Sequence, residues 1–493
     1  MAEEKRKKRP TLFQALIPII FLIIFLSVNV ILVYKDDALF GPNQIGLILS
    51  AAVAGLVCMS LGISWIQMEK SIVRSINAAM PSMLILLLIG SLAGTWMLSG
   101  IVPAMIYYGL QILNPTIFLI ATCIVCAIVS IATGSSWSTV ATVGIALLGI
   151  GKALGIADGL IAGAIISGAY FGDKMSPLSD TTNLAPAMAG TDLFTHIKYM
   201  AFTTVPSLFI ALIIYLIIGL NFDASIGTKN IDQVLIAIDQ VFNINPILFL
   251  VPAVVIFLII KKVPAIPALL IGSLLGGLFA IIFQGQVIRQ VVEGDNSYIY
   301  ESFVAVVNSL ITDVAIAADN DMVSELLVTG GMAGMLNTIW LIITAMIFGG
   351  TMEAGGLLQR ITQSIIYLAK STGSLVASTA GTCIFFNSTA SDQYLAIVVP
   401  GRMFANTYRN RGLKPENLSR TLEDSGTVTS VLIPWNTCGA TQASVLGVST
   451  FVYAPFCFFN IISPFMTILF AYLNIKIARY KTAPKPDNTE EHV

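Results

Sequence analysis

Four short polar strings interrupt the apolar stretches of this chain, and their side chains suit a small hard cation. Hydroxyl, amide and carboxylate oxygens are the ligands that hard cations take in proteins. The strings are residues 133–139, 172–183, 387–392 and 436–437. Their candidate ligands are Thr133, Ser135, Ser136, Ser138, Asp173, Asp180, Asn183, Asn387, Ser388, Thr389, Asp392, Asn436 and Thr437. We therefore predict one ion-binding site built from all four strings.

The three carboxylates within these strings carry most of this argument. A charged side chain at the centre of a membrane segment costs roughly 2.5–3.5 kcal/mol on insertion scales, so its presence there points to a role. We predict that Asp180 and Asp392 couple a proton to a cation. Asp173 is a third candidate, although its neighbour Lys174 could simply neutralise it. Any single serine or threonine, by contrast, is more often a packing residue that hydrogen-bonds a neighbouring helix.

A carboxylate in such a place also supplies a mechanism. Removal from water favours the protonated acid, whereas a bound cation favours the ionised form. Proton and cation therefore compete for one group, and the site releases one ion as it takes the other. This is antiport by mutual exclusion.

The elements that position these residues are predicted to be membrane helices. Charged residues make up 11% of the 493 residues, against about 25% in a soluble domain, and 56% are hydrophobic. The mean hydropathy is +0.86. Apolar runs of bilayer-spanning length separate the charged stretches. The net charge is −1, and the basic residues form no stripe that could neutralise the phosphates of a nucleic acid. Nucleic acid is therefore excluded as a partner.

The basic residues of the N-terminus orient the first helix. Lys5, Arg6, Lys7, Lys8 and Arg9 precede an apolar run that is too long for the core of a signal peptide and lacks a small-residue cleavage site. The run is therefore expected to stay as a first span. By the positive-inside rule, the N-terminus lies in the cytoplasm.

The chain divides into two halves with the same order of elements. In the first half we predict spans at 11–34, 44–66 and 78–100, a re-entrant hairpin of 115–132 and 137–151, an interrupted span at 157–190 and a span at 196–220. In the second half we predict spans at 245–260, 263–283 and 332–354, a hairpin of 372–386 and 393–404, an interrupted span near 420–447 and a last span near 449–477. The fold class is thus an all-α polytopic membrane protein.

Five crossings per half make the second repeat an inverted copy of the first, because an odd number leaves the chain on the opposite side. Pro177 and Pro434 mark corresponding breaks. The predicted parts are a basic N-terminus 1–10, a first repeat 11–220, an external linker 221–243, a second repeat 244–478 with an external acidic loop 284–331, and a tail 479–493. Both termini are cytoplasmic. Inverted repeats with broken helices are typical of secondary transporters.

Loop charges agree with this topology. Acidic residues dominate 284–331, and basic residues such as Lys261 and Lys262 fall in predicted cytoplasmic segments. Glu423 and Asp424 lie near a predicted cytoplasmic end and are interpreted as interfacial. His196 starts a span and is not interpreted as a proton relay.

Other functions fit the sequence less well. Cys123 and Cys126 form a CxxC pair inside an apolar segment with no further metal ligand nearby, which favours packing. The chain has no ATP-binding Walker string for a pump. Residues 170–173 lack the first glycine of the GxGD sequence of an intramembrane aspartyl protease, so no enzyme is predicted. An ion channel stays an alternative that transport kinetics would separate.

Three longer strings resemble the NhaC family of bacterial sodium/proton antiporters. They are residues 168–186, 422–430 and 433–439, in matching order, and the resemblance extends over essentially the whole chain. It implies a secondary transporter of the bacterial inner membrane, working as a homodimer. It also implies that the first three spans of each half form a scaffold, against which the hairpin and broken helix move.

The cargo expected from this resemblance is Na⁺ exchanged for H⁺, with the lipid bilayer as surroundings and no cofactor besides the transported ion. The predicted Na⁺ ligands are Asp180, Asn183, Ser136, Asn387, Asp392 and Asn436. The family also includes exchangers of malate and lactate and carriers of amino acids, so a small organic substrate is the alternative. The nearest cations for such a carboxylate, Lys174 and Arg402, are few, which favours sodium.

Overall fold

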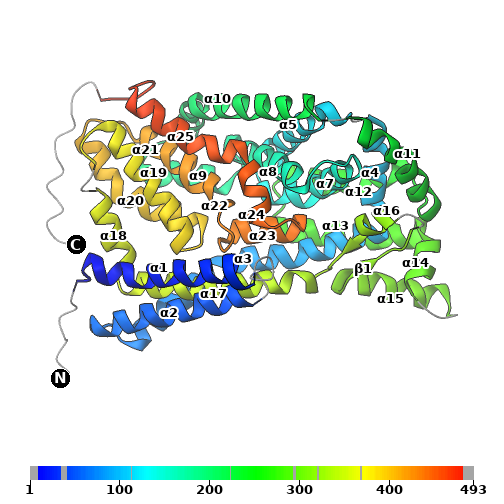
Figure 1. Cartoon of the computed structure of the whole chain (residues 1–493), viewed down its shortest axis with the longest axis horizontal. Coiled ribbons are helices and arrows are strands. Elements are labelled where there is room, and N and C mark those ends of the chain that lie inside the picture. Colours follow the sequence, from blue (N-terminus) through cyan, green and yellow to red (C-terminus); the bar gives the residue numbers. More distant parts are fainter. Residues whose placement is uncertain are drawn as a thin grey trace.

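The computed structural model describes residues 9–34, 41–112, 114–222, 224–292, 296–318, 321–366 and 369–480, and nearly all of them are helical (Figure 1). The first half contains α1 (Leu12–Ser27), a π-helical turn (Val28–Val33), α2 (Pro42–Ser60), α3 (Trp65–Leu98), α4 (Ile101–Ile112), α5 (Pro115–Thr133), α6 (Ser136–Thr139), a π-helical turn (Val140–Gly144), α7 (Ile145–Ala153), α8 (Asp158–Met175), α9 (Asp180–Ala189) and α10 (Leu193–Leu220).

The connection and second half follow the same pattern with additions. They contain α11 (Ala224–Val241), a 3₁₀ turn (Pro246–Phe249), α12 (Leu250–Ile260), α13 (Ala265–Phe283), α14 (Gly285–Val291), α15 (Tyr298–Ile311), β1 (Val314–Ala315), α16 (Asp321–Leu326), β2 (Val328–Thr329), a 3₁₀ turn (Ala333–Met335), α17 (Leu336–Ala354), α18 (Leu357–Ile366), α19 (Thr372–Thr389), α20 (Gln393–Asn410), α21 (Pro415–Leu422), a π-helical segment (Glu423–Thr427), α22 (Val428–Ser430), α23 (Thr437–Leu446), α24 (Thr450–Tyr453), a 3₁₀ turn (Ala454–Phe456) and α25 (Phe458–Tyr472).

This is a multi-span membrane protein. Within the described residues, six helical stretches are long and apolar enough to cross a bilayer, and two bent helix pairs raise the number to eight. The six are α2, α3, α5, α10, α13 and Ala333–Ala354. The ten crossings predicted from the sequence also count the interrupted helices α8–α9 and α21–α23, and that number stays a prediction.

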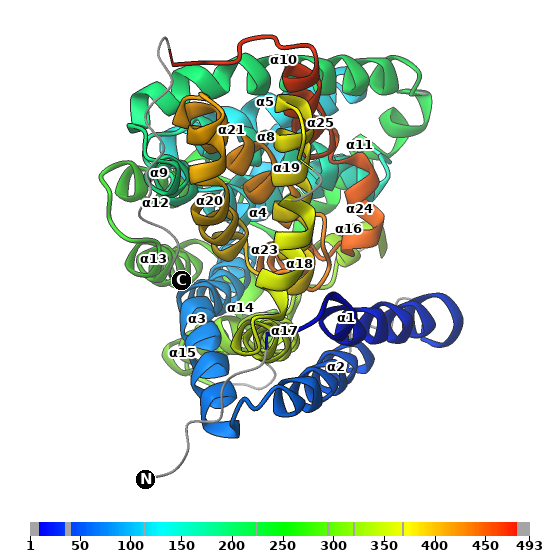
Figure 2. The same cartoon turned by 90° about the vertical axis from the view of Figure 1, so that its left-hand side faces the viewer.

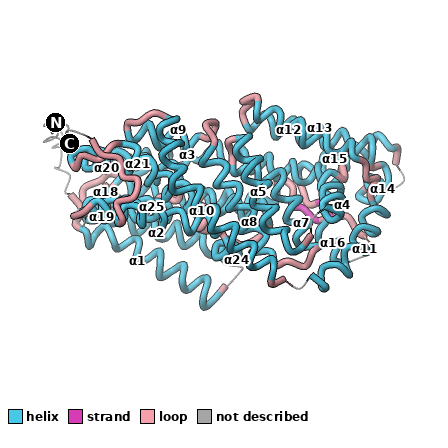
Figure 3. The backbone as a smooth tube through the Cα atoms, turned by 90° about the horizontal axis from the view of Figure 1, so that it is seen from above, coloured by secondary structure: helices cyan, strands magenta, loops and turns pink. Residues whose placement is uncertain are grey.

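The helices form two layers with a hairpin between them (Figure 2). One layer contains α1, α2, α3 and α17, and the other contains α5, α8, α10 and α25. The pair α19–α20 lies between the layers. Along the long axis, α18–α21 gather at one end, whereas α4, α7, α11 and α16 gather at the other (Figure 3). The hairpin α19–α20 therefore lies toward one end of the molecule, whereas α5 lies near the middle and α7 toward the other end (Figure 3).

Helix α3 begins earlier than predicted. It starts at Trp65 instead of near residue 78, because Ser64 and Gln67 form a reciprocal capping box and no glycine or proline occurs in residues 65–78. The helix has 34 residues, which corresponds to roughly 50 Å at 1.5 Å per residue. Lys70 and Arg74 lie within it.

The sequence did not predict α4, α11 and α18, and it left the order of the acidic segment 284–331 open. That segment folds into α14, α15, α16 and an antiparallel β1–β2 pair. It is joined to α3 by a hydrogen bond from Ser91 Oγ to the carbonyl of Leu310, at 2.9 Å. Predicted features at residues 1–8, 293–295, 319–320 and 481–493 lie outside the described residues.

The segments 115–193 and 372–450 repeat with a constant spacing of 257 residues, which is also the spacing of Pro177 and Pro434. The helices that begin at this spacing start at Pro115 and Thr372, Ser136 and Gln393, Asp158 and Pro415, Asp180 and Thr437, and Leu193 and Thr450. Three left-handed backbone positions repeat in the same way, namely Gly134 (φ +69°) and Ser391 (φ +58°), Gly155 and Gly412, and Gly190 and Gly447. The internal repeat is thus present in helix ends and turns.

Candidate functional site

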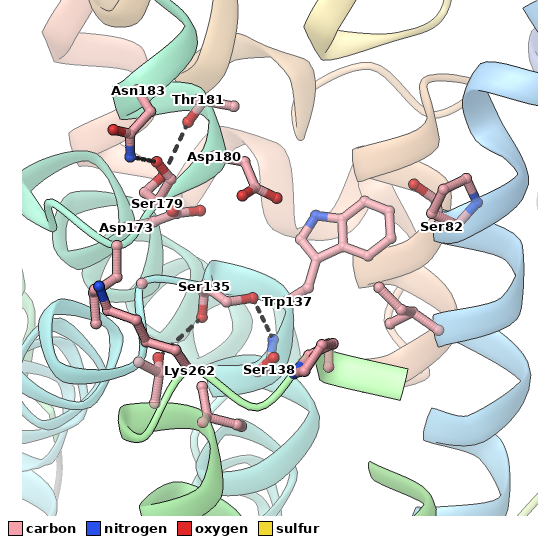
Figure 4. A pocket seen from close by; sticks show the side chains of 18 of the residues that line it. Ser82, Ser135, Trp137, Ser138, Asp173, Ser179, Asp180, Thr181, Asn183 and Lys262 are labelled. Carbon is pink, nitrogen blue, oxygen red and sulfur yellow. Dashed lines mark hydrogen bonds between the residues drawn. The ribbon is translucent and has the colours of Figure 1, made fainter. Parts of the chain in front are cut away.

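A cavity of about 830 Å³ lies where the tip of the α5–α7 hairpin meets the break between α8 and α9 (Figure 4). Six predicted site residues line it: Thr133, Ser135, Ser138, Asp173, Asp180 and Asn183. Helix α3 contributes Ala78 and Ser82, and the turn between α12 and α13 contributes Lys262. Gln393 and Tyr394 complete the wall from the start of α20. Both hairpins therefore reach this cavity.

Asp173 ties the first hairpin tip to α8. The backbone nitrogen and hydroxyl of Ser136 both donate to Asp173 Oδ2, at 3.1 and 2.7 Å. Gly134 allows this approach, because a Cβ there would lie 2.5 Å from Leu178 Cβ and its φ of +69° disfavours any other residue. The predicted ligand Ser136 is thus engaged with the predicted coupling residue Asp173.

The break between α8 and α9 leaves backbone groups that local side chains satisfy. Ser179 caps α9 by accepting a hydrogen bond from the backbone of Thr182. The Asn183 amide nitrogen donates to the carbonyls of Pro177 and Ser179, at 3.0 and 2.7 Å, so its amide oxygen is the atom available to a ligand. Asp180 is the first residue of α9 and faces the cavity, where the positive helix end favours a carboxylate.

The predicted ligands of the second half form hydrogen bonds with one another and with their neighbours. Asn387 donates to the carbonyl of Gly426 at 2.7 Å and to Thr429 Oγ1 at 3.0 Å, and Asn436 donates to the carbonyl of Asn387 at 3.0 Å. The backbone nitrogen of Thr437 donates to the Ser391 carbonyl. These predicted ligands form a buried network outside the cavity wall.

Ser388 and Thr389, also predicted as ligands, use their hydroxyls within α19. They donate to the carbonyls of Ile384 and Phe385, one turn earlier, at 3.0 and 2.7 Å. This is the usual bonding of a helical hydroxyl. Neither residue lines the cavity.

Asp392 lies directly behind the cavity wall. Its side chain is 2% exposed and caps α20 by accepting a hydrogen bond from the backbone of Leu395 at 3.0 Å. The next two residues, Gln393 and Tyr394, line the cavity. Asp173 and Asp180 thus face the cavity, whereas Asp392 reaches it only through its neighbours.

Lys174 does not neutralise Asp173, because it forms an ion pair with Asp424. Both side chains are fully buried. Asp424 also accepts hydrogen bonds from Thr203 at 2.8 Å and Ser463 at 3.3 Å. The interpretation of Glu423 and Asp424 as interfacial is wrong, since both are 0% exposed. No local pattern could reveal this pair, whose members are 250 residues apart.

Lys262 is the second residue that sequence reasoning missed. It was expected in a cytoplasmic loop, yet it lies in the turn between α12 and α13 and lines the cavity (Figure 4). The cavity therefore contains one cation opposite two carboxylates.

The cysteine pair behaves as predicted. Cys123 and Cys126 are buried in α5 and free. Among the described residues, no group of three or more histidine, cysteine or acidic side chains could hold a metal ion. The oxygen donors of the cavity are the candidate ligands that remain.

Comparison with known proteins decides the family. Residues 168–475 match the model of the Na⁺/H⁺ antiporter family. The chain belongs to this family. It is therefore a secondary transporter in the membrane and not an enzyme, as the resemblance to NhaC implied. A Na⁺/H⁺ antiporter NhaC of Alkalihalophilus pseudofirmus is 38% identical over 436 residues, which cover 88% of this chain and 91% of that protein.

Relatives named for other cargoes are about as similar. A malate-2H⁺/Na⁺-lactate antiporter of Bacillus subtilis is 37% identical over 95% of this chain and 96% of that protein. The arginine/ornithine antiporter ArcD of Halobacterium salinarum is 33% identical over 98% of this chain and 96% of that protein. Family membership alone does not select the cargo of this antiporter.

Proposed function

We propose that this antiporter exchanges Na⁺ for H⁺ by alternating access to the cavity between the first hairpin and the α8–α9 break. The observation that carries the proposal is the meeting of Asp173 and Asp180 with hydroxyl and amide oxygens in one cavity. A cation that enters can replace the proton on a carboxylate, because both stabilise the same negative charge.

The proposed Na⁺ ligands come from both halves. Asp180, Asn183 and Ser136 would bind from the first half, and Asn387, Asp392 and Asn436 from the second. Ser136 currently donates to Asp173, and the Asn387–Asn436 pair is closed. We therefore propose that the second-half ligands engage in another conformation of the cycle, in which Asp392 takes over from Asp180.

The architecture we propose is a pair of inverted repeats in a bacterial inner membrane, with both termini cytoplasmic and a homodimeric assembly. Support comes from the 257-residue spacing of helix starts in the two hairpins and the broken helices. The first spans of each half would be the scaffold, and the hairpin with its broken helix would move. A reporter fused after Val493 should report a cytoplasmic location.

A second candidate is exchange of a small organic anion or an amino acid. Lys262 favours it, because a cation in the cavity can bind a carboxylate, and so does a volume of about 830 Å³, which is far larger than one ion needs. Two relatives named for organic cargoes, the malate/lactate and the arginine/ornithine antiporter, also favour it.

Transport in proteoliposomes separates these candidates. An imposed Na⁺ gradient should move protons with no organic solute present, and Asp180→Asn or Asp392→Asn should abolish that movement in folded protein. Dependence on added malate, lactate, arginine or ornithine would select the second candidate. Full activity in both variants would reject the carboxylate mechanism, and single-channel currents would reject transport by alternating access.

A further inference from the structure

Glu423 is a buried carboxylate that the cavity mechanism does not use. It opens the π-helical segment Glu423–Thr427 and is 0% exposed. Its Oε1 accepts a hydrogen bond from Thr181 Oγ1 at 3.1 Å. Its Oε2 has no hydrogen-bond partner among the described residues, and no basic side chain of the described chain lies within 4.0 Å of it. One oxygen of this carboxyl group is thus unsatisfied.

The neighbouring charges compensate Glu423 only in part. Lys174 attracts its negative charge, but this cation is paired with Asp424 and also donates to Ser463 at 3.1 Å. The other ionisable groups around Glu423 are Asp173 on α8 and Cys383 on α19, which add no positive charge. An ionised Glu423 would therefore be a buried net charge, which is strongly unfavourable. The site needs either a proton or a second cation.

Two hydroxyl groups join Glu423 to the cavity. Thr181 Oγ1 lies 3.2 Å from Ser179 Oγ, and both residues line the cavity (Figure 4). The side chain of Ser179 in turn lies beside that of Asp173 (Figure 4). The order Asp173, Ser179, Thr181, Glu423 is thus a line of oxygen atoms that runs from the first half of the protein into the second.

We propose that Glu423 is a second proton-binding site of the transport cycle, loaded from the cavity through the hydroxyls of Ser179 and Thr181. The proposal rests on the proposed Na⁺/H⁺ exchange. In the loading step, Thr181 gives its hydroxyl proton to Glu423 and receives one from Ser179, which receives one from cavity water or from Asp173. Each hydroxyl ends with the proton count it began with, and the reverse order unloads the site.

The π-helical segment agrees with such a role, because single π-helical turns occur frequently at functional sites. Glu423 and Asp424 are consecutive residues of this segment, and their side chains have separate partners. Asp424 belongs to the permanent pair with Lys174, and Glu423 is the member of the two whose proton can leave. A proton can therefore bind to and leave Glu423 while the buried ion pair between Lys174 and Asp424 stays intact.

Infrared difference spectroscopy of the purified protein tests the protonation of Glu423 without requiring transport. Na⁺-free protein at neutral pH should show the carbonyl stretch of a buried carboxylic acid, which Glu423→Gln removes and Glu353→Gln leaves in place. Glu353 is the matched control, because it is a partly buried glutamate at the end of α17. An unchanged acid band in Glu423→Gln would overturn the proposal.

Transport measurements test whether Glu423 takes part in proton exchange. Glu423→Gln should move one proton fewer per Na⁺ than the wild type, as read from the reversal potential in proteoliposomes. Thr181→Val should keep the ratio and slow proton exchange on the order of 10²-fold, whereas Thr122→Val, which removes a buried hydroxyl with no partner in the described structure, should not. An unchanged ratio in Glu423→Gln would overturn this inference alone. Absence of Na⁺-driven proton movement in the wild type would instead reject the proposed function.

Discussion

The segments 115–193 and 372–450 of this antiporter share their helix starts but not their charge pattern. At the base of the first hairpin, Ser130 Oγ donates to the carbonyl of Ala169 at 2.6 Å. At positions 257 residues later, Asn387 Nδ2 donates to the carbonyl of Gly426 at 2.7 Å. The same contact is made twice with different side chains. The repeated feature is therefore the geometry of the hairpin against the broken helix.

Three carboxylates near the cavity have no acidic counterpart in the other half. Asp173 corresponds to Ser430, Asp180 corresponds to Thr437, and Asp392 corresponds to Ser135. Each carboxylate has a hydroxyl residue as its counterpart. The contact of Ser136 with Asp173 has a neutral equivalent between Gln393 and Ser430, at 3.5 Å. The same backbone arrangement therefore carries a charged hydrogen bond in one segment and a neutral one in the other.

The largest effect on transport is expected when a carboxylate of the first half is replaced by its neutral counterpart from the second half. Asp180→Thr introduces the residue of the second half and should reduce Na⁺-driven proton movement to the level of empty liposomes, because the cavity loses its helix-end carboxylate. Asp158→Asn is the control, since Asp158 is an exposed carboxylate paired with Lys152 at 3.2 Å. Exchange that survives Asp180→Thr would show that the carboxylate asymmetry is not required.

The ion pair between Lys174 and Asp424 is the next difference, since Val431 and Ser167 occupy the corresponding positions. Lys174→Met should lower the stability by about 3–5 kcal/mol, because it leaves Asp424 buried without its cation. The double variant with Asp424→Met should recover most of this loss. Thermal unfolding in detergent measures both. A double variant no more stable than the single one would contradict the pairing.

Substitutions at the two hairpin tips are expected to change the stability of the protein in opposite directions. Gly134→Ala should destabilise the protein by about 2–4 kcal/mol, because it adds a left-handed conformation and a clash with Leu178. Ser391→Gly should instead stabilise it by roughly 1 kcal/mol, because Ser391 already bears the cost of a φ of +58°. The same thermal assay compares the two. Shifts of equal sign would mean that the tips are not equivalent.

A smaller loss of stability than for Gly134→Ala is expected from the amide network. Asn387→Ser introduces the residue of the first hairpin and should cost about 1–3 kcal/mol, because Thr429 and Asn436 lose a buried partner. Ser388→Ala removes only a hydrogen bond within α19 and serves as control. A loss in Asn387→Ser no greater than in the control would show that the network contributes no stability.

The sequence by itself determined the transmembrane class, the repeat spacing and the places where helices break. These features are local: apolar runs, Pro177 and Pro434, and the Gly134 turn all act within a few residues. The residue types that line the cavity, above all Asp180 and Asn183, were also predictable, because polar groups inside apolar segments are costly and therefore conspicuous.

Only the tertiary structure decided which charges are compensated. Lys174 meets Asp424 across 250 residues, Lys262 enters the cavity from a turn, and Glu423 is buried instead of interfacial. Electrostatic energy depends on distance in space and on the loss of water, and neither quantity can be read from position along the chain. The sequence placed the carboxylates near helix breaks, and the fold determined which of them line the cavity.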